Sequence, residues 1–534
     1  MSTPQSTVYI CSGVKLDNRY THTIYWDSLT DQQEYFAGKV VRTFPAYTFL
    51  RKKWSIKVGA TMEDALDWSY LYFRNGTGKF MYYFINTVEY VNDATVELFL
   101  ELDVMQTYAR DYTMLQAFVE RNHVADDTFG FHLVDEGLET GELVTRGTLD
   151  VDLSAMCILV QSTVNLNDTN DATYDKQADG GLIGGVYNGC GVYAYHAESA
   201  EQITIDIQSM DTLSKTDAVV AMWMYPKRLV KISDTQTMAD VGIAAQGRPY
   251  VVKGIKSDNL PWEYERPKVI GDFTPNNNKV LCYPYSFLYV TNNAGETAVL
   301  PFEFFGDPEF PVFRLTGAIS PDGGVRLYPL NYKGEQYAYE HGVNLPGFPS
   351  CSWNSDTYKL WLAQNQAQHS LAMASAGAQI VAGVAGAVMT GGIGGVMGAG
   401  SVIGGMSTIA NILAQKKDMS IQPPQARGNY STSINMSAGF QTFTIMRKSI
   451  TVEYARIIDG FFDMYGYKIN AVMTPRRKVR KHWTYLKTQN AAISGAINSE
   501  DKVHIESILD NGITFWVNGD NIGNYSFAED NTTI

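Results

Sequence analysis

The most constraining feature of this 534-residue chain is a long stretch without a charged side chain. Residues 360–415, 56 in a row, contain no Asp, Glu, Lys or Arg. Within this stretch, two runs of 18 residues, 372–389 and 396–413, flank the glycine-rich turn TGGIGG. Each run would span about 27 Å as a helix, close to the roughly 30 Å thickness of a bilayer's hydrocarbon core. The stretch therefore has the geometry of a membrane hairpin.

The composition of this hairpin predicts conditional insertion, because Gly, Ala, Ser and Thr dominate it and glycine disfavours helix in water by about 1 kcal/mol. Three glycine pairs have the spacing that lets helices approach closely in lipid: Gly391/Gly395, Gly394/Gly398 and Gly400/Gly404. We assign the membrane-active or plugging role to the apolar residues and the turn glycines: Ile380, Val381, Val384, Val388, Met389, Gly391, Gly392, Ile393, Gly394, Gly395, Val396, Met397, Val402, Ile403, Met406, Ile409, Ile412 and Leu413.

Two other interpretations of the uncharged stretch stay open. A flexible linker is the first, although linkers rarely contain so many Ile, Val and Met residues. A buried core hairpin is the second, although such a hairpin would usually have a polar face. A membrane-active or lumen-plugging segment is therefore the favoured interpretation. His369, near its start, could make release pH-sensitive, but an ordinary polar helix residue is the default.

The rest of the chain predicts a mainly β protein with some helices (α+β) and several domains. Aromatic residues make up 12% of the chain, which favours strands. Residues 80–104 form two aromatic and β-branched runs around Asn-Asp-Ala, which predicts a hairpin. Residues 47–58 alternate as a strand should, 61–74 predict a helix capped by Thr61, and 440–454 predict a strand followed by a helix.

No motif for catalysis, nucleotide binding or metal binding is present, and we predict no enzyme activity, no cofactor and no metal site. The histidines are dispersed, and the five cysteines are scattered without a CxxC pair, as expected of synthesis in a reducing compartment. The acidic pairs Asp126-Asp127 and Asp135-Glu136 lie in turn-like surroundings, which predicts solvated loop residues. No signal peptide pattern is visible at the N-terminus.

The densest charged cluster is basic and lies near the C-terminal end: Arg476, Arg477, Lys478, Arg480 and Lys481. Such a run beside Trp483 and Tyr485 can bind nucleic acid. However, the whole chain carries a net charge of -14, while residues 401–534 hold 14 basic against 11 acidic groups. Opposite charges on different parts of one chain favour contacts between subunits. We therefore prefer a contact with another subunit or a neighbouring protein.

Several short motifs are distributed along both parts of the chain. In its first half they are ELDVMQTYARDY at 101–112, FVERNHV at 118–124 and VDEGL at 134–138, followed by LCYPYS at 281–286. Towards its C-terminal end they are IQPPQ at 421–425, FFDMYGYKIN at 461–470, ISGAIN at 493–498, ILDNGITFW at 508–516 and DNIGNYS at 520–526. These motifs resemble the tail knob protein family of phi29-like short-tailed phages. The family also has a long neutral Gly/Ala-rich loop just before the PPQ element, in the same order.

The resemblance implies a domain organisation and an assembly. Residues 1–150 and 425–534 would together build a β-barrel tail-tube domain, with one or more β-rich knob domains inserted at 151–345. Residues 346–424 would form the plug segment, with 372–413 as its membrane-active loop. Six copies would form a ring or tube at the distal end of the tail in the virion. The middle region matches the family poorly beyond LCYPYS, so it leaves the outer shape of the knob open.

The resemblance also implies a function and partners. The six loops would plug the lumen, then leave it and form a pore in the host cytoplasmic membrane for genome ejection. Genomic DNA would pass through without sequence-specific binding, as an acidic wall that repels phosphates allows. The other partners would be a lower collar or connector tail protein and a tail-tip protein with wall-hydrolase activity.

Two other functions remain as alternatives. A receptor-binding or adhesion tail protein without membrane-penetrating activity is suggested by the tyrosine-rich middle region. A tail-associated wall hydrolase is the weaker alternative, because no catalytic constellation is visible in the sequence. These alternatives differ in the part of the chain that would carry the activity.

Overall fold

The structure of the chain is a computed structural model. It is mainly β with few helices and contains more than one domain. The structure describes residues 6–50, 53–168, 173–178, 182–183, 186–187, 190–213, 215, 218–244, 247–261, 266–321, 323–345, 348, 350–352, 429–431 and 442–534. The predicted membrane-active residues at 380–413, and His369, lie outside these described residues.

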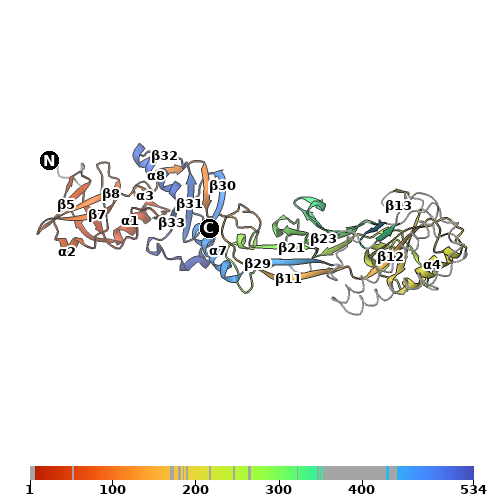
Figure 1. Ribbon diagram of the computed structural model, residues 1–534. Coiled ribbons are helices and arrows are strands. Elements are labelled where there is room, and N and C mark those ends of the chain that lie inside the picture. Colours follow the sequence, from red (N-terminus) through yellow and green to blue (C-terminus); the bar gives the residue numbers. More distant parts are fainter. Residues whose placement is uncertain are drawn as a thin grey trace. The chain divides into compact units, whose positions relative to one another are not determined.

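Two compact units make up the chain. Unit 1 combines Met1–Glu142, Lys268–Tyr285 and Ile450–Ile534, so both ends of the chain and one short internal segment belong to it. Unit 2 contains Leu143–Pro267 and Ser286–Ser449. Figure 1 labels the elements of each unit along the chain.

The N-terminal part of unit 1 is a seven-stranded sheet with the order β3-β1-β6-β7-β8-β5-β4. Its strands are β1 (Val8–Cys11), β3 (Val40–Phe44), β4 (Thr48–Leu50), β5 (Ser55–Val58), β6 (Tyr70–Arg74), β7 (Phe80–Asn92) and β8 (Thr95–Leu102). Strands β7 and β8 form the predicted hairpin, which reverses at Asp93-Ala94 (Figure 1). The two edge strands, β3 and β4, are joined by residues 45–47 alone.

Both faces of this sheet are covered, which explains its aromatic content. Along β6, Tyr70 and Tyr72 belong to one buried cluster, whereas Leu71 and Phe73 belong to a second cluster on the opposite face. Successive side chains of a strand point to opposite faces, so four buried residues in a row require two cores. The first cluster also includes Trp483 and residues of the C-terminal part of unit 1.

The C-terminal part of unit 1 is built around a five-stranded sheet with the order β2-β33-β31-β10-β30. Its strands are β2 (His22–Ile24), β10 (Ala117–Asn122), β30 (Tyr467–Met473), β31 (Trp483–Gln489) and β33 (Ile513–Trp516). A small sheet pairs β9 (Tyr112–Met114) with β32 (Ile493–Gly495).

The described part of unit 1 also contains helices and 3-10 turns. The helices are α1 (Leu29–Gly38), α2 (Met62–Ala65), α3 (Val104–Thr107), α7 (Val452–Tyr465) and α8 (Ser499–Asn511). The 3-10 turns are η5 (Asn278–Leu281), η9 (Gly519–Asn521) and η10 (Tyr525–Asp530).

The predicted helix over residues 61–74 is wrong except for its first turn. Thr61 does cap a helix, accepting a hydrogen bond from the Asp64 amide at 3.3 Å, but α2 ends at Ala65. The following Tyr70–Arg74 segment is strand β6 in the middle of the sheet. Burial on both faces of a sheet suits its aromatic side chains, and this tertiary environment overrides the local helical pattern.

The predicted single strand over residues 47–58 is also wrong, because this segment folds back on itself. Strands β4 and β5 pair with each other antiparallel, with Thr48 opposite Lys57. At the reversal, Trp54 adopts a left-handed backbone conformation with φ of 49°.

The prediction for residues 440–454 is closer to the structure. Strand β29 (Thr442–Ile450) ends four residues earlier than expected, and Thr451 caps the helix α7 that follows.

Unit 2 contains the remaining sheets. Strands β11 (Leu143–Asp152), β29, β21 (Ser286–Thr291) and β22 (Thr297–Leu300) form one of them in this order. A six-stranded sheet has the order β18 (Tyr250–Val251), β15 (Gly191–His196), β12 (Met156–Ser162), β16 (Val219–Pro226), β27 (Ser350–Ser352) and β28 (Asn429–Ser431). Two short pairs are β13 (Leu182–Ile183) with β14 (Val186–Tyr187) and β17 (Val230–Lys231) with β19 (Gly254–Ile255).

A further sheet of unit 2 runs in the order β20-β23-β24-β25, and β26 also pairs with β24. Its strands are β20 (Asp258–Pro261), β23 (Val312–Gly317), β24 (Val325–Tyr332), β25 (Glu335–Tyr337) and β26 (Val343–Leu345). In the described part of unit 2, the helical elements include α4 (Ala200–Thr212) and the 3-10 turns η1 (Ala197–Ser199), η3 (Lys227–Leu229), η6 (Phe302–Phe304) and η7 (Tyr339–His341).

Candidate functional site

The predicted basic cluster lies in unit 1, in the segment that connects β30 to β31. Of its five members, Arg476 and Lys481 are exposed, whereas Arg477, Lys478 and Arg480 are partly buried. The structure therefore brings the five together in one loop. It does not present all of them to solvent.

The first part of this loop binds to the N-terminal half of unit 1. The Arg477 guanidinium lies over the Tyr112 ring, 4.7 Å from its centroid, and donates a hydrogen bond to the Ala109 carbonyl at 3.1 Å. The Lys478 Nζ pairs with Asp27 Oδ2 at 2.5 Å. A cation stacked on an aromatic ring and an ion pair both fix side chains in place. These two residues therefore join segments that are far apart in the sequence.

The second part of the loop binds to the C-terminal end of the chain. Arg480 donates to the Asn531 carbonyl at 3.4 Å, and Lys481 pairs with Asp530 at 3.2 Å. Asp530 also lies 3.0 Å from His482 Nε2. Arg476 and Lys481 are thus the two members of the cluster that remain exposed.

A buried charged triad lies in the same unit. The Glu136 carboxylate is fully buried and is bound by the Arg121 guanidinium and the Lys279 ammonium, whose side chains are only 13% and 4% exposed. Its Oε1 also accepts a hydrogen bond from the Lys468 amide at 2.9 Å. Burial lowers the pKa of Lys279, and Glu136 opposes that shift. The triad holds the internal segment 268–285 within unit 1.

Three further carboxylates bind the asparagine turn that precedes Lys279. Asp459 Oδ1 accepts from the Asn277 amide at 3.0 Å, and its Oδ2 accepts from the Asn276 amide at 2.9 Å. The Asn277 side-chain amide also donates to Asp463 at 2.8 Å. Asp127 accepts from the Asn278 amide at 2.9 Å. Burial raises the pKa of Asp459 to about 6 and also raises the pKa of Asp127 and Asp463.

These contacts correct the prediction that both acidic pairs are solvated. Asp126 and Asp135 are exposed as expected, but Glu136 is buried and Asp127 is partly buried. Asp127 also accepts a hydrogen bond from the Tyr467 hydroxyl at 2.6 Å. Within each pair the second carboxylate points into the protein, where it binds residues that come from distant parts of the sequence. Local sequence carries no signal for this, apart from the presence of Glu136 in the VDEGL motif.

His123 is a buried histidine held in one neutral form. Its Nδ1 accepts from the Tyr485 amide at 2.8 Å, so its Nε2 carries the proton and donates to the Asp463 carbonyl at 3.0 Å. Burial lowers the pKa of His123 to about 3, and the neighbouring Arg480 adds to the shift. The imidazole is therefore structural and neutral at physiological pH.

We expect His123 to make unit 1 sensitive to acid. The unfolded chain binds a proton at this residue near pH 6.5, whereas the folded chain does so only near pH 3. The free energy of unfolding therefore falls by up to about 1.4 kcal/mol per pH unit as the pH falls from about 6.5 towards 3. Thermal melting at pH 7, 6 and 5 should show a weaker pH dependence for His123→Gln than for the natural chain. Parallel decreases in the two proteins would contradict this assignment.

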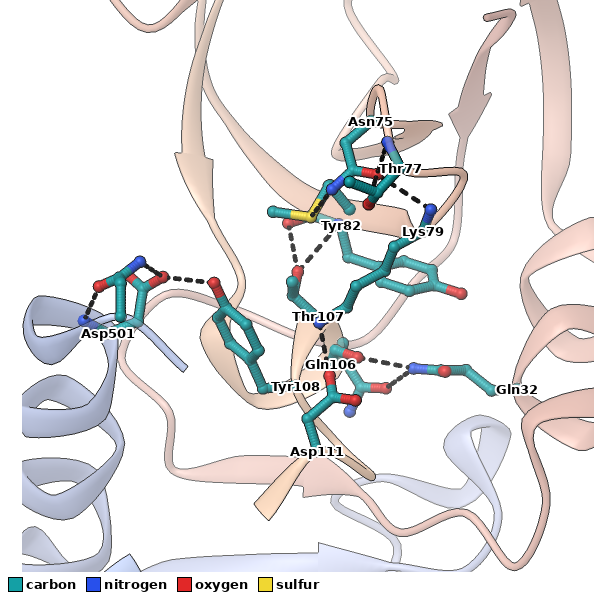
Figure 2. Close-up of polar contacts among 12 residues, drawn as sticks. Gln32, Asn75, Thr77, Lys79, Tyr82, Gln106, Thr107, Tyr108, Asp111 and Asp501 are labelled. Carbon is teal, nitrogen blue, oxygen red and sulfur yellow. Dashed lines mark hydrogen bonds and ion pairs between the residues drawn. The ribbon is translucent and has the colours of Figure 1, made fainter. Parts of the chain in front are cut away.

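The motif at 101–112 also supports the fold through buried polar contacts, as Figure 2 shows. The Gln106 side chain receives a hydrogen bond from the Trp26 indole at 2.6 Å and donates to Thr23 at 2.9 Å. Gln32 donates to the Gln106 backbone carbonyl at 2.9 Å. These bonds hold β2 and α1 against α3 and satisfy the buried amide.

A shallow cavity of about 170 Å³ lies beside Gln32 and Gln106. Three of its four charged lining residues form polar contacts: Lys79 pairs with Asp111 at 2.5 Å, and Arg110 donates to the Asp27 carbonyl, while the fourth, Arg74, lies over the Phe80 ring. In the same region, Tyr108 donates to Asp501 on α8 at 2.7 Å (Figure 2). The cavity offers no arrangement for a reaction, and its side chains stabilise the junction of the two sheets.

Among the residues that the structure describes, no group of three or more His, Cys, Asp or Glu residues is placed to bind a metal ion. No helix among the described residues is long and apolar enough to cross a membrane. Burial raises the pKa of the Cys11 and Cys157 thiols to about 12, so both are inert at neutral pH.

Comparisons with known proteins identify relatives along the whole chain. The model of the C-terminal domain of the Bacillus phage phi29 tail knob protein gp9 matches residues 249–531, and the model of the N-terminus of caudoviral major tail proteins matches residues 4–113. The tail knob protein gp9 of Bacillus phage phi29 is 24% identical, with 98% of both chains covered. The corresponding protein of Bacillus phage B103 is 23% identical, with 97% of both chains covered.

A solved structure has the same fold. The tail knob protein gp12 of bacteriophage C1 superposes with a TM-score of 0.63 at 12% sequence identity, covering 99% of this chain and 100% of that chain. The family model of the phi29 protein covers more than half of the present chain. The chain therefore belongs to the tail knob protein family of phi29-like phages and is a structural protein of the phage tail.

Proposed function

We propose that the protein is the distal tube of a short-tailed phage, a hexamer whose uncharged loops plug the lumen and later form a pore in the host cytoplasmic membrane. One observation carries this proposal: a tail knob protein contains 56 consecutive residues without charge, long enough for a membrane hairpin. In the closed tube, six such loops would bury their apolar side chains against each other. At a bilayer, helices formed by the loops would satisfy their own backbone hydrogen bonds.

Unit 1 is the proposed tube domain. Support comes from the match of residues 4–113 to the N-terminus of major tail proteins, and from the union of both chain ends in one unit. The seven-stranded sheet has edge strands joined by only three residues, which would draw the edges towards each other as in a β-barrel. The part of unit 2 within residues 151–345, which leaves out the tube segment 268–285, would then form the knob, and 346–424 would enter the lumen as the plug.

Partners follow from this placement. Arg476 and Lys481, exposed on the basic loop, would contact an acidic surface of a neighbouring subunit or of the lower collar protein. A tail-tip protein with wall-hydrolase activity would open the path to the membrane. Genomic DNA would slide along the lumen, because a chain with a net charge of -14 has no general affinity for phosphates.

Cryo-electron microscopy of the purified protein tests the assembly. We expect a six-fold ring with density closing its channel. In a variant in which a Gly/Ser linker of equal length replaces residues 372–413, the same ring should form with an open channel. A monomer at micromolar concentration, a ring of another symmetry, or a natural protein with an open channel would overturn the proposal.

A further inference from the structure

The solvent-facing side of one sheet in unit 2 has an unusual set of side chains. Arg314 on β23 lies opposite Tyr328 on β24, and Arg326 lies two residues before Tyr328 on the same strand. Their sequence neighbours Phe313, Leu315, Val325 and Leu327 are buried. Since side chains alternate along a strand, the arginines and Tyr328 share the opposite face. On this face the two arginines are partly exposed, whereas Tyr328 is covered and only 6% exposed.

Two exposed tyrosines complete this surface. The Arg314 guanidinium lies over the Tyr337 ring, 4.8 Å from its centroid, and the Arg326 guanidinium lies over the Tyr339 ring at 4.2 Å. The rings of Tyr328 and Tyr339 are 5.3 Å apart. These contacts connect the five residues into one continuous surface, which we name the arginine–tyrosine strip: Arg314, Arg326, Tyr328, Tyr337 and Tyr339.

Each arginine of the strip is held in place by neutral groups. Arg314 Nε donates to Asn259 Oδ1 at 2.8 Å. Arg326 donates from Nε to the Tyr339 carbonyl at 2.9 Å and from Nη1 to Asn344 Oδ1 at 2.7 Å. Such bonds fix a guanidinium without neutralising it. The strip is therefore preorganised.

The charge of the strip is not balanced by an ion pair. Among the described residues, no carboxylate forms a salt bridge with Arg314 or Arg326, whereas Arg228 of the same unit pairs with Asp258 at 2.6 Å. In the sequence, the exposed residues Glu335 and Glu340 lie close to the two exposed tyrosines, Glu309 lies five residues before Arg314, and Asp322 lies four residues before Arg326. Tyr337 and Tyr339 are 51% and 54% exposed, so their rings remain accessible.

We propose that the arginine–tyrosine strip binds an acidic polysaccharide. Guanidinium groups bind planar or tetrahedral anions through paired N–H donors, and exposed tyrosine rings offer flat apolar faces to the C–H groups of sugar rings. A polymer that carries both sugar rings and acidic groups would contact the exposed rings of Tyr337 and Tyr339 together with the guanidinium groups stacked on them. Nucleic acid fits less well, because its binding relies on a strongly basic field and the chain is acidic overall.

This inference does not depend on the plug or on pore formation. It assigns to unit 2 a surface that would hold the tail tip on a glycan-coated cell while unit 1 serves as a tube. Failure of one proposal therefore leaves the other intact.

Binding of the full-length protein to immobilised dextran sulfate, neutral dextran and single-stranded DNA tests the proposal. We expect dextran sulfate to bind at least tenfold more tightly than either of the other two. The double variant Arg314→Gln/Arg326→Gln should lose at least tenfold in affinity for dextran sulfate. Tyr337→Ala/Tyr339→Ala should lose a similar amount, whereas Tyr337→Phe/Tyr339→Phe, which keeps the rings, should retain most of it.

The matched control uses the same residue types on unit 1. Arg74 and Tyr90 are both exposed there, and Arg74 also lies over an aromatic ring, that of Phe80, at 4.5 Å. The variant Arg74→Gln/Tyr90→Ala should bind dextran sulfate as the natural chain does. Equal losses in the control and the strip variants would overturn the proposal, as would tighter binding of DNA or equal binding of neutral dextran. An unchanged thermal unfolding midpoint shows that each variant is folded.

Discussion

Replacing Glu136 with glutamine should destabilise unit 1 by about 3–5 kcal/mol, the cost of breaking a buried ion pair by removal of one partner. The carboxylate is fully buried between the Arg121 and Lys279 side chains, which are also largely inaccessible to water. Without the carboxylate, two cations would stay buried close together with one neutral acceptor. Lys279 can escape by losing its proton, since burial already lowers its pKa, but Arg121 cannot.

Thermal unfolding followed by circular dichroism measures this effect. The matched control is Glu139→Gln, which makes the same chemical change three positions away at an exposed residue. We expect a decrease of many degrees for Glu136→Gln and almost none for Glu139→Gln. Limited proteolysis should also cleave the segment 268–285 faster in Glu136→Gln, because Lys279 anchors that segment. Equal midpoints in the two variants would show that the triad contributes little.

Part of the fold could be predicted from the sequence because the deciding interactions are local. The hairpin of β7 and β8 reverses within two residues, and its strands alternate aromatic and β-branched side chains. Helix α7 begins where Thr451 supplies an N-terminal cap. The segment 70–74 could not be assigned in this way, because its strand state depends on two cores formed by residues from elsewhere in the chain.

The candidate sites were harder to predict, because their contacts connect residues that are hundreds of positions apart. Asp126 and Asp127 are equivalent in the sequence, yet only Asp127 meets Asn278 and Tyr467. Likewise, the basic cluster reads as one exposed run, whereas Lys478 pairs with Asp27 and Arg477 stacks on Tyr112. Arg476 and Lys481 are exposed because these tertiary contacts involve their neighbours, and their spacing in the sequence does not show this.

The second large effect that we expect is a loss of membrane permeabilisation when charge is introduced into the uncharged stretch. A single aspartate in the middle of each 18-residue run, as in Val384→Asp/Ile403→Asp, should reduce membrane permeabilisation more than tenfold. A charge at the centre of a membrane helix costs about 2.5–3.5 kcal/mol, which is decisive for a segment whose glycine content already makes insertion marginal. The control Val384→Ala/Ile403→Ala introduces no charge, so most of the permeabilising activity should remain.

We propose that residues 372–413 give the tail knob its ability to permeabilise a membrane. The most direct measurement is release of a trapped dye from liposomes by the full-length protein, at pH 7 and pH 5, compared with the variant in which a Gly/Ser linker of equal length replaces 372–413. We predict that both proteins form the same ring but that only the natural chain releases the dye. Full release by the linker variant, or no release by the natural chain at either pH, would contradict the claim.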